Sequence, residues 1–104
     1  MKITDTVYRG ADNLLEWQML IDGVQENIAN TTRATLTVNG TTIDSDVSTD
    51  AFDWTTKTYH LLLNLGFEGL PIGLYRNCSL KIYNVNNTNG IIWDCDITIE
   101  VRSC

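Results

Sequence analysis

The sequence predicts a single all-β domain, a sandwich or barrel of six to seven antiparallel strands. Apolar and polar residues alternate with a period of two over several segments, which is the pattern of strands that bury one face. Pairs of residues that favour tight turns, such as Asp22-Gly23 and Asn39-Gly40, close two of these segments. No segment has a sustained helical period, although residues 51–54 have room for a single helical turn. A length of 104 residues suits one domain with one core and leaves little room for a second.

Four of the predicted strands lie in the first half of the chain. Residues 2–9 are expected to form a strand on the evidence of only two aliphatic residues, Ile3 and Val7. We therefore describe residues 1–13 as an N-terminal strand or arm that precedes the regular part of the domain. The other three strands of this half are expected at residues 15–21, 32–38 and 41–44.

The second half contains the longest predicted strands. In the last strand every odd position from Ile91 to Val101 is apolar, and the even positions from Asp94 to Arg102 are polar. The preceding segment 86–90 reads Asn-Asn-Thr-Asn-Gly, and because Asn and Gly tolerate positive φ angles it is predicted to be a hairpin tip. The three strands of this half are expected at residues 59–65, 74–85 and 91–101.

The register of the last hairpin follows from matching its apolar faces. Facing residues of an antiparallel pair share one side of the sheet, so apolar positions must face apolar positions. Two registers satisfy this condition. The first places Ile82 opposite Trp93 and Leu80 opposite Cys95. The second places Ile82 opposite Ile91 and Cys78 opposite Cys95.

The three cysteines are expected to be reduced. Residues 1–5 lack the apolar stretch of a secretory signal, which favours a reducing compartment. Cys78 and Cys95 lie on the predicted core faces, where a thiol acts as a small hydrophobic group, and Cys104 is expected to be free. A disulfide between Cys78 and Cys95 across the hairpin is the alternative.

The composition argues against two classes of partner. The chain has 13 acidic and 7 basic residues and a net charge of −6, which opposes binding to the phosphate backbone of nucleic acid or to anionic membranes. The longest apolar run, residues 61–63, is far shorter than the roughly 20 residues of a membrane-spanning helix. We expect neither a nucleic-acid nor a membrane partner.

No combination of residues predicts catalysis, a metal or a cofactor. The only histidine, His60, is expected to be a partly exposed strand residue on the face opposite Tyr59, Leu61 and Leu63. The acidic residues of the loop around residues 44–53 lack the spacing of an EF-hand, and phosphate-loop, zinc and nucleophile-elbow motifs are absent from the sequence. We expect a non-enzymatic protein without cofactor or metal, and we describe the loop as a solvated acidic segment.

The tryptophans divide into two groups. Trp17 and Trp93 occupy inward positions of predicted strands and are expected in the core. Trp54 lies in the loop 45–56 and either plugs one end of the domain or projects as an anchor into a partner. Together with the loop 66–73, this region supplies the residues that we expect to contact a partner, which are Phe52, Trp54, Phe67, Leu70 and Ile72.

Four segments together resemble a known group of proteins. They are Leu-Leu-Glu-Trp-Gln-Met-Leu-Ile-Asp-Gly at 14–23, the Thr-rich strand 31–38, Gly-Leu-Tyr at 73–75, and Gly-Ile-Ile-Trp at 90–93. Over residues 14–102 the chain resembles small immunoglobulin-like bacteriophage virion modules, such as the N-terminal domain of baseplate upper proteins and related head and tail accessory domains. The chain departs from immunoglobulin domains in two respects, because Tyr75 precedes Cys78 by three residues rather than two and the paired Cys-Trp-Cys signature is missing.

The resemblance implies an immunoglobulin-like β-sandwich that serves as a structural or accessory protein of a virion. It implies docking on capsid or tail proteins through loops and sheet edges, as a capsid decoration or cement protein or as a baseplate or tail adaptor. It also implies assembly in the host cytoplasm, either as a homo-oligomer of three or more copies in the particle or as monomers at quasi-equivalent sites.

The alternative function is a carbohydrate- or ligand-binding module. Such modules bind sugars on aromatic side chains, and Trp54 with Tyr59 or Tyr83 would supply them here. Two or more coplanar exposed rings favour this alternative. A hydrolase would require two carboxylates that face each other across a cleft.

Overall fold

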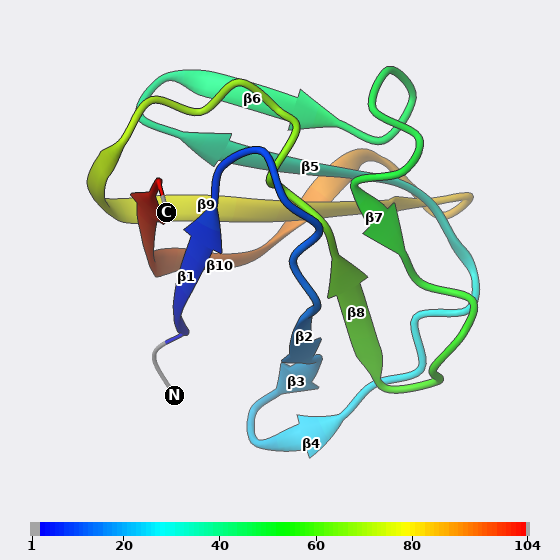
Figure 1. The fold of residues 1–104 in the computed structure, drawn as a ribbon. Coiled ribbons are helices and arrows are strands. Elements are labelled where there is room, and N and C mark those ends of the chain that lie inside the picture. Colours follow the sequence, from blue (N-terminus) through cyan, green and yellow to red (C-terminus); the bar gives the residue numbers. More distant parts are fainter. Residues whose placement is uncertain (1–2, 104) are drawn as a thin grey trace.

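Two β-sheets pack against each other, and the strands of the smaller sheet run across those of the larger one (Figure 1). The structure is a computed structural model and describes residues 3–103. Within this range it contains ten strands and no helix, so the all-β class is confirmed. None of these residues belongs to a helix that is long and apolar enough to cross a membrane.

The larger sheet has five strands in the order β1-β10-β9-β5-β6. The N-terminal strand β1 pairs with β10 in parallel, and the other neighbours are antiparallel. The strands are β1 (Thr4–Tyr8), β5 (Thr31–Val38), β6 (Thr41–Asp44), β9 (Gly73–Asn84) and β10 (Asn87–Arg102).

The smaller sheet has three strands in the order β2-β8-β7, and a separate two-stranded hairpin, β3-β4, extends beside it. The strands are β2 (Leu15–Gln18), β3 (Leu20–Ile21), β4 (Val24–Gln25), β7 (Phe52–Asp53) and β8 (His60–Leu63).

Two tight turns confirm the turn signals of the sequence. Asp22 and Gly23 connect β3 to β4, and Asn39 and Gly40 connect β5 to β6. All four residues have positive φ angles between 48° and 79°, which is the requirement of a two-residue turn that matches the twist of its strands.

The predicted strand 15–21 is divided at Met19. Residues 15–18 pair with β8, whereas Leu20 already pairs with Gln25 of the next strand. Residues 51–54 also differ from expectation, since they contain the short strand β7 rather than a helical turn. The division of one strand and the unpredicted strands β4 and β7 account for the larger number of strands.

The β9-β10 hairpin differs from both predicted registers because β10 contains bulges. Ile91 faces Ile82, as the second register requires, but Cys78 faces Ile97 instead of Cys95. Register shifts between 92 and 94 and between 94 and 97 each add one residue to β10. The predicted tip at 86–90 is also shorter, because Asn87 already pairs with Asn84.

The bulges explain why one of the predicted core residues is exposed. After two added residues the alternation returns to its original phase, so the C-terminal part of β10 is buried as predicted. Between the bulges Cys95 points to solvent, and the prediction that it is buried is wrong. Cys78 is buried as predicted, and neither thiol forms a disulfide. Cys104 lies outside the described residues.

The core lies between the two sheets and contains one of the two tryptophans predicted there. Trp17 is 2% exposed, whereas Trp93 is half-buried and packs against the edge of the core. The most deeply buried side chains come from both sheets and include Val7, Met19, Leu36, Leu61, Leu65, Leu80, Ile82, Ile97 and Ile99.

Candidate functional site

A buried asparagine joins the edge of the larger sheet to the end of the smaller one. The Asn13 side chain accepts a hydrogen bond from the Tyr8 amide at 2.8 Å and donates one to the Tyr8 carbonyl at 2.9 Å. It therefore pairs with β1 as a neighbouring strand would. The Asn13 amide in turn donates to the Asn64 side chain, which follows β8, at 3.0 Å.

The chain passes so closely at this junction that one position has no room for a side chain. A Cβ atom on Gly66 would lie 1.9 Å from the Ala11 carbonyl oxygen and 2.6 Å from Asn13 Nδ2. Gly66 also accepts a hydrogen bond from the Gly10 amide at 2.8 Å. The junction fixes residues 11–14 beside β8 and so determines what the outer face of the smaller sheet presents.

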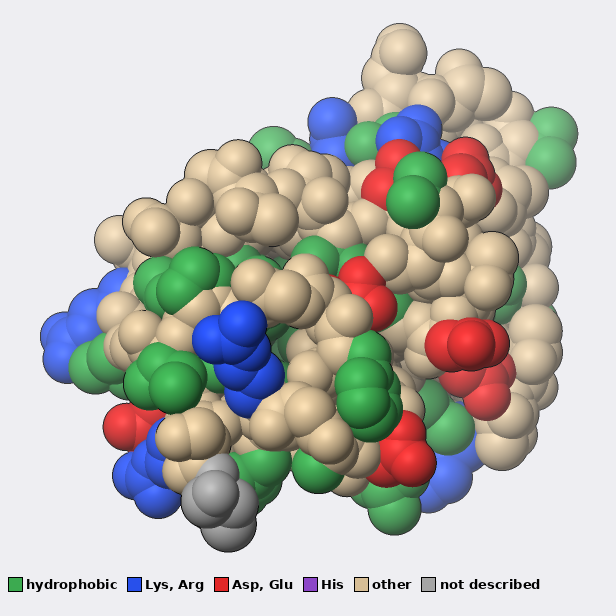
Figure 2. Space-filling view, turned by 45° about the horizontal axis from the view of Figure 1, so that its top comes forward, with side chains coloured by type: hydrophobic (Ala, Val, Ile, Leu, Met, Phe, Trp, Pro, Cys, Tyr) green, Lys and Arg blue, Asp and Glu red, His purple; other side chains and the backbone are tan. Residues whose placement is uncertain are grey.

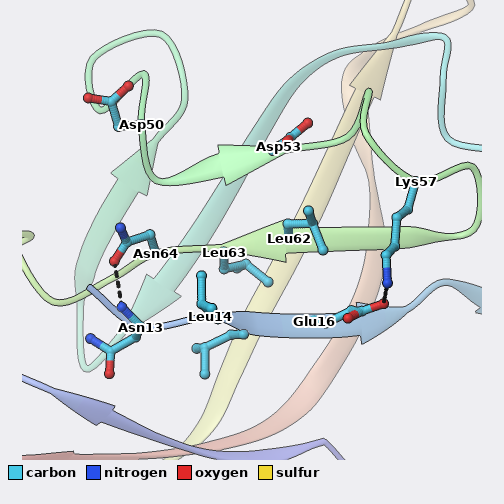
Figure 3. Close-up of a pocket in the computed structure, with 10 residues that line it drawn as sticks. Asn13, Leu14, Glu16, Asp50, Asp53, Lys57, Leu62, Leu63 and Asn64 are labelled. Carbon is cyan, nitrogen blue, oxygen red and sulfur yellow. Dashed lines mark hydrogen bonds and ion pairs between the residues drawn. The ribbon is translucent and has the colours of Figure 1, made fainter. Parts of the chain in front are cut away.

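The outer face of the smaller sheet contains residues that alternate with its core residues. Leu15 and Leu63 face the core, and their neighbours Leu14 and Leu62 face outward. Leu14 is 97% exposed, the highest fraction among the large hydrophobic residues of the described chain that are exposed. Figure 3 shows Leu14 and Leu62 between the Glu16–Lys57 pair and the Asn13–Asn64 contact.

Two adjoining hollows lie over this face and the neighbouring loops. The first has a volume of about 350 Å³ and the second about 560 Å³, and Asp50 and Asn64 line both. We call their combined lining the acidic groove. Its charged residues and the apolar residues at least partly exposed in it are Asp12, Leu14, Glu16, Val47, Asp50, Asp53, Lys57, Leu62, Phe67 and Glu68.

Exposed apolar side chains line both parts of the acidic groove. Leu14 lies in the first hollow, and Val47 and Phe67, which are 82% and 65% exposed, line the second. Figure 2 shows apolar side chains and carboxylates interspersed over the right half of the view, the side on which Figure 1 places β7 and the loop before it. Apolar groups surrounded by polar ones are typical of binding surfaces.

Two carboxylates of the groove are held in the ionised form by different partners. Lys57 donates a hydrogen bond to Glu16 and lowers the pKa of that carboxyl. The hydroxyl of Thr56, together with the amide of Thr55, lowers the pKa of Asp53 to about 2. The charge of Glu16 is therefore balanced by a cation, whereas the charge of Asp53 is stabilised by neutral donors and remains unbalanced.

The described residues offer no arrangement for a metal ion. Asp44 pairs with Arg33, and Asp53 accepts hydrogen bonds from Thr55 and Thr56, so both are engaged with side chains of the protein. Between residues 3 and 103 there is no group of three or more His, Cys, Asp or Glu side chains that would hold a metal.

Three carboxylates, those of Glu16, Asp50 and Asp53, line the first hollow, and two of them lack a property of a general acid. A catalytic acid that donates a proton near neutral pH needs a raised pKa. The pKa values of Glu16 and Asp53 are both lowered. The only histidine is half-buried, with its Nε2 atom 3.9 Å from Glu16. Glu16 and Asp53 are therefore suited to interactions with positively charged groups and not to proton donation near neutral pH.

The five residues expected to contact a partner lie in three environments. Phe52 and Leu70 are buried in the core and Trp54 is half-buried against it, as a plug would be. Phe67 lines the acidic groove, and Ile72 is exposed outside its lining. The structure thus brings only Phe67 of the five into the groove.

The sequence-based prediction missed Leu14 and most of the acidic residues of the groove. One signal for Leu14 was available. In an alternating strand only one of two consecutive leucines can face the core, so the pair Leu14-Leu15 implies an outward leucine. The acidic residues come from three separate segments of the chain, and no local pattern connects them.

Comparisons with known proteins do not assign the chain to a family. No family model matches it, and no curated protein matches it significantly.

Proposed function

We propose that this protein is a non-enzymatic structural or accessory protein of a bacteriophage virion that docks on a capsid or tail protein through the acidic groove. The observation that carries the proposal is the set of exposed apolar side chains, Leu14, Val47 and Phe67, in one acid-rimmed groove. The resemblance of residues 14–102 to virion modules supports the setting in a phage particle.

The anatomy of the groove agrees with that of protein-binding surfaces. Binding energy at such surfaces comes mainly from a few apolar anchors that lose water, and the polar rim sets orientation and association rate. Leu14 suits the role of an anchor because it contributes almost nothing to the fold while being fully available to a partner.

The environment of the aromatic residues favours docking over sugar binding. A sugar-binding platform requires free ring faces. The Tyr83 ring lies 4.8 Å from the Arg33 guanidinium carbon and 5.5 Å from the Lys81 ammonium, and Trp54 packs against the core. Tyr59 is exposed, but a single ring does not make a platform.

Binding to purified virion components tests the proposal. The capsid and tail proteins encoded by neighbouring reading frames are purified singly, and their affinity for this protein is measured by biolayer interferometry. We expect one of them to bind, and we expect Leu14→Asp to weaken binding by at least about tenfold. Val85→Asp is the matched control, because Val85 is 79% exposed at the tip of the β9-β10 hairpin, outside the groove lining.

Two results would overturn the proposed function. One is that none of the purified capsid and tail proteins binds the wild-type protein. The other is that a glycan array yields a ligand whose binding Leu14→Asp leaves unchanged.

A further inference from the structure

We propose that the segment bound in the acidic groove is a basic, extended stretch of the partner protein that places apolar side chains beside Leu14 and Phe67. This inference rests on the proposed function, since it names the chemistry of the partner at the same site.

The charge of the molecule is concentrated in the groove. Its lining holds five acidic residues and one lysine, and therefore four of the six units of net negative charge of the chain. A surface of one sign attracts a partner of the opposite sign and speeds association. An acidic segment would have to approach against this field, and a neutral segment would remove water from the carboxylates without compensation.

Most of these carboxylates are not neutralised by the protein itself. Among the described residues Lys57 pairs only with Glu16, and the Asp50 and Glu68 carboxylates have no hydrogen-bond or ion-pair partner. Asp53 accepts its hydrogen bonds from threonine, which leaves its negative charge in place. Arginine and lysine side chains of a partner would supply the missing cations, and the planar guanidinium would bind a carboxylate through two hydrogen bonds.

The shape of the groove favours an extended segment over a compact ligand. Its two hollows adjoin at Asp50 and Asn64 and have an apolar group in each, Leu14 in one and Phe67 in the other. Successive side chains of an extended chain point in opposite directions. A segment with alternating basic and apolar residues would therefore place one set against the apolar groups and direct the other towards the rim.

A labelled synthetic peptide tests the inference on the intact protein. The probe is an acetylated, amidated peptide in which lysine or arginine alternates with leucine or valine, and its acidic counterpart replaces every basic residue by glutamate. We expect the basic peptide to bind by fluorescence anisotropy and to bind at least about tenfold more weakly at high salt, because exposed charges are screened. The acidic peptide should show no binding.

Paired charge variants locate the binding site. Asp50→Asn/Glu68→Gln removes two unpaired carboxylates from the groove and should weaken binding of the basic peptide by at least about tenfold. Asp22→Asn/Glu26→Gln removes the same charge outside the groove lining and should change it less than about twofold, with asparagine tolerating the positive φ angle at position 22. Matching unfolding midpoints would confirm that all variants are folded.

Several outcomes would overturn the inference. Equal weakening by both double variants would mean that the peptide responds to total charge and not to the groove. Size-exclusion chromatography with light scattering could show that the wild-type protein dimerises and that Leu14→Asp abolishes the dimer. The groove would then bind a second copy of this protein instead of a basic segment.

The failures of the two proposals can be told apart. The binding of a purified capsid or tail protein could depend on Leu14 but not on salt or on Asp50 and Glu68. This result would support the proposed function and contradict the inference that the bound segment is basic. Conversely, the basic peptide could bind in the groove while no capsid or tail protein binds. This result would support the proposed chemistry of the bound segment and contradict the virion function.

Discussion

The outer faces of the two sheets differ in how their carboxylates are stabilised. On the larger sheet, Arg33 donates to Asp44 through two nitrogen atoms, and Arg102 pairs with Glu100 at 2.6 Å. The hydroxyl groups of Thr37 on β5 and Thr42 on β6 form a hydrogen bond with each other at 3.2 Å. The charges of Asp44 and Glu100 are therefore balanced by cations of the same sheet.

On the smaller sheet, Lys57 balances the charge of Glu16, but the hydrogen bonds that stabilise Asp53 come from neutral groups. The pKa of Asp44 on the larger sheet is lowered by the cation Arg33, whereas the pKa of Asp53 on the smaller sheet is lowered by threonine hydroxyl and amide donors. Both carboxylates are ionised at neutral pH, but only Asp53 contributes its full charge to the surroundings. A face with unbalanced charge beside exposed leucine and phenylalanine is suited to a partner, and a self-balanced face is suited to solvent.

The largest effect is expected from breaking the junction that joins the two sheets. In Gly66→Ala the added methyl group would collide with the Ala11 carbonyl and the Asn13 side chain, so backbone must shift. We expect a loss of about 3 kcal/mol in the free energy of unfolding, measured by urea denaturation. The control is Ser79→Ala on the larger sheet. Gly69→Ala would be a poorer control, because alanine is strained at the positive φ angle of Gly69. A loss below about 0.5 kcal/mol would contradict the close approach at Gly66.

The second effect concerns the asparagine of the same junction. Asn13→Ala removes the acceptor and donor that pair with the Tyr8 backbone in a site that is 7% exposed. We expect a loss of about 2 kcal/mol, because buried backbone groups lose their partner. Hydrogen exchange should show faster exchange of the Tyr8 amide, while amides of β5 and β9 keep their relative protection. Unchanged exchange at Tyr8 would contradict the strand-like pairing.

A pH titration compares the two ways of stabilising a carboxylate. The folded pKa of Asp53, about 2, lies below its ordinary value of 3.8, so its contribution to stability is present above 3.8 and is lost as the pH falls towards 2. In Thr56→Ala the pKa of Asp53, measured by NMR, should rise towards 3.8 because the strongest of its hydrogen bonds is lost. Arg33→Ala should leave the pKa of Asp53 unchanged. If the pKa of Asp53 changed in Arg33→Ala and not in Thr56→Ala, the two faces would not differ in how they stabilise their carboxylates.

The smallest effect on stability is expected at the exposed anchor. Leu14→Ser should change the free energy of unfolding by less than about 0.5 kcal/mol, since the side chain is almost fully exposed. Leu15→Ala, one residue along the chain, should cost about 3 kcal/mol because it leaves a cavity in the core. Equal losses for the two variants would mean that Leu14 serves the fold and is not free to bind a partner.

Local sequence patterns predicted the strands and turns whose conformation is set by residues adjacent in the chain. The strands 31–38 and 41–44 and the turns at 22–23 and 39–40 follow from alternation and from residues that accept positive φ angles. The burial of Trp17 and Cys78 follows from the same alternation. The bulges in β10 escaped prediction, because the apolar alternation of residues 91–101 continues through them unchanged.

The site was predicted less well because it depends on segments distant in the chain. Of the expected contact residues Phe67 lines the groove, whereas Phe52 and Leu70 fill the core. A bulky apolar residue in a loop has the same sequence pattern in both situations. Which of them is buried depends on how the loop folds over the sheet.

The sequence by itself determined an all-β chain, with strands and turns set by local alternation and backbone preference and a surplus of negative charge. Only the tertiary structure decided where that charge is concentrated. The Asn13–Gly66 junction brings residues 12–16 beside β8 and the loops at 47–53 and 67–68, and so unites acidic side chains from separate segments with Leu14 and Phe67. Electrostatic and apolar surfaces depend on distances in space, which separation along the chain does not specify.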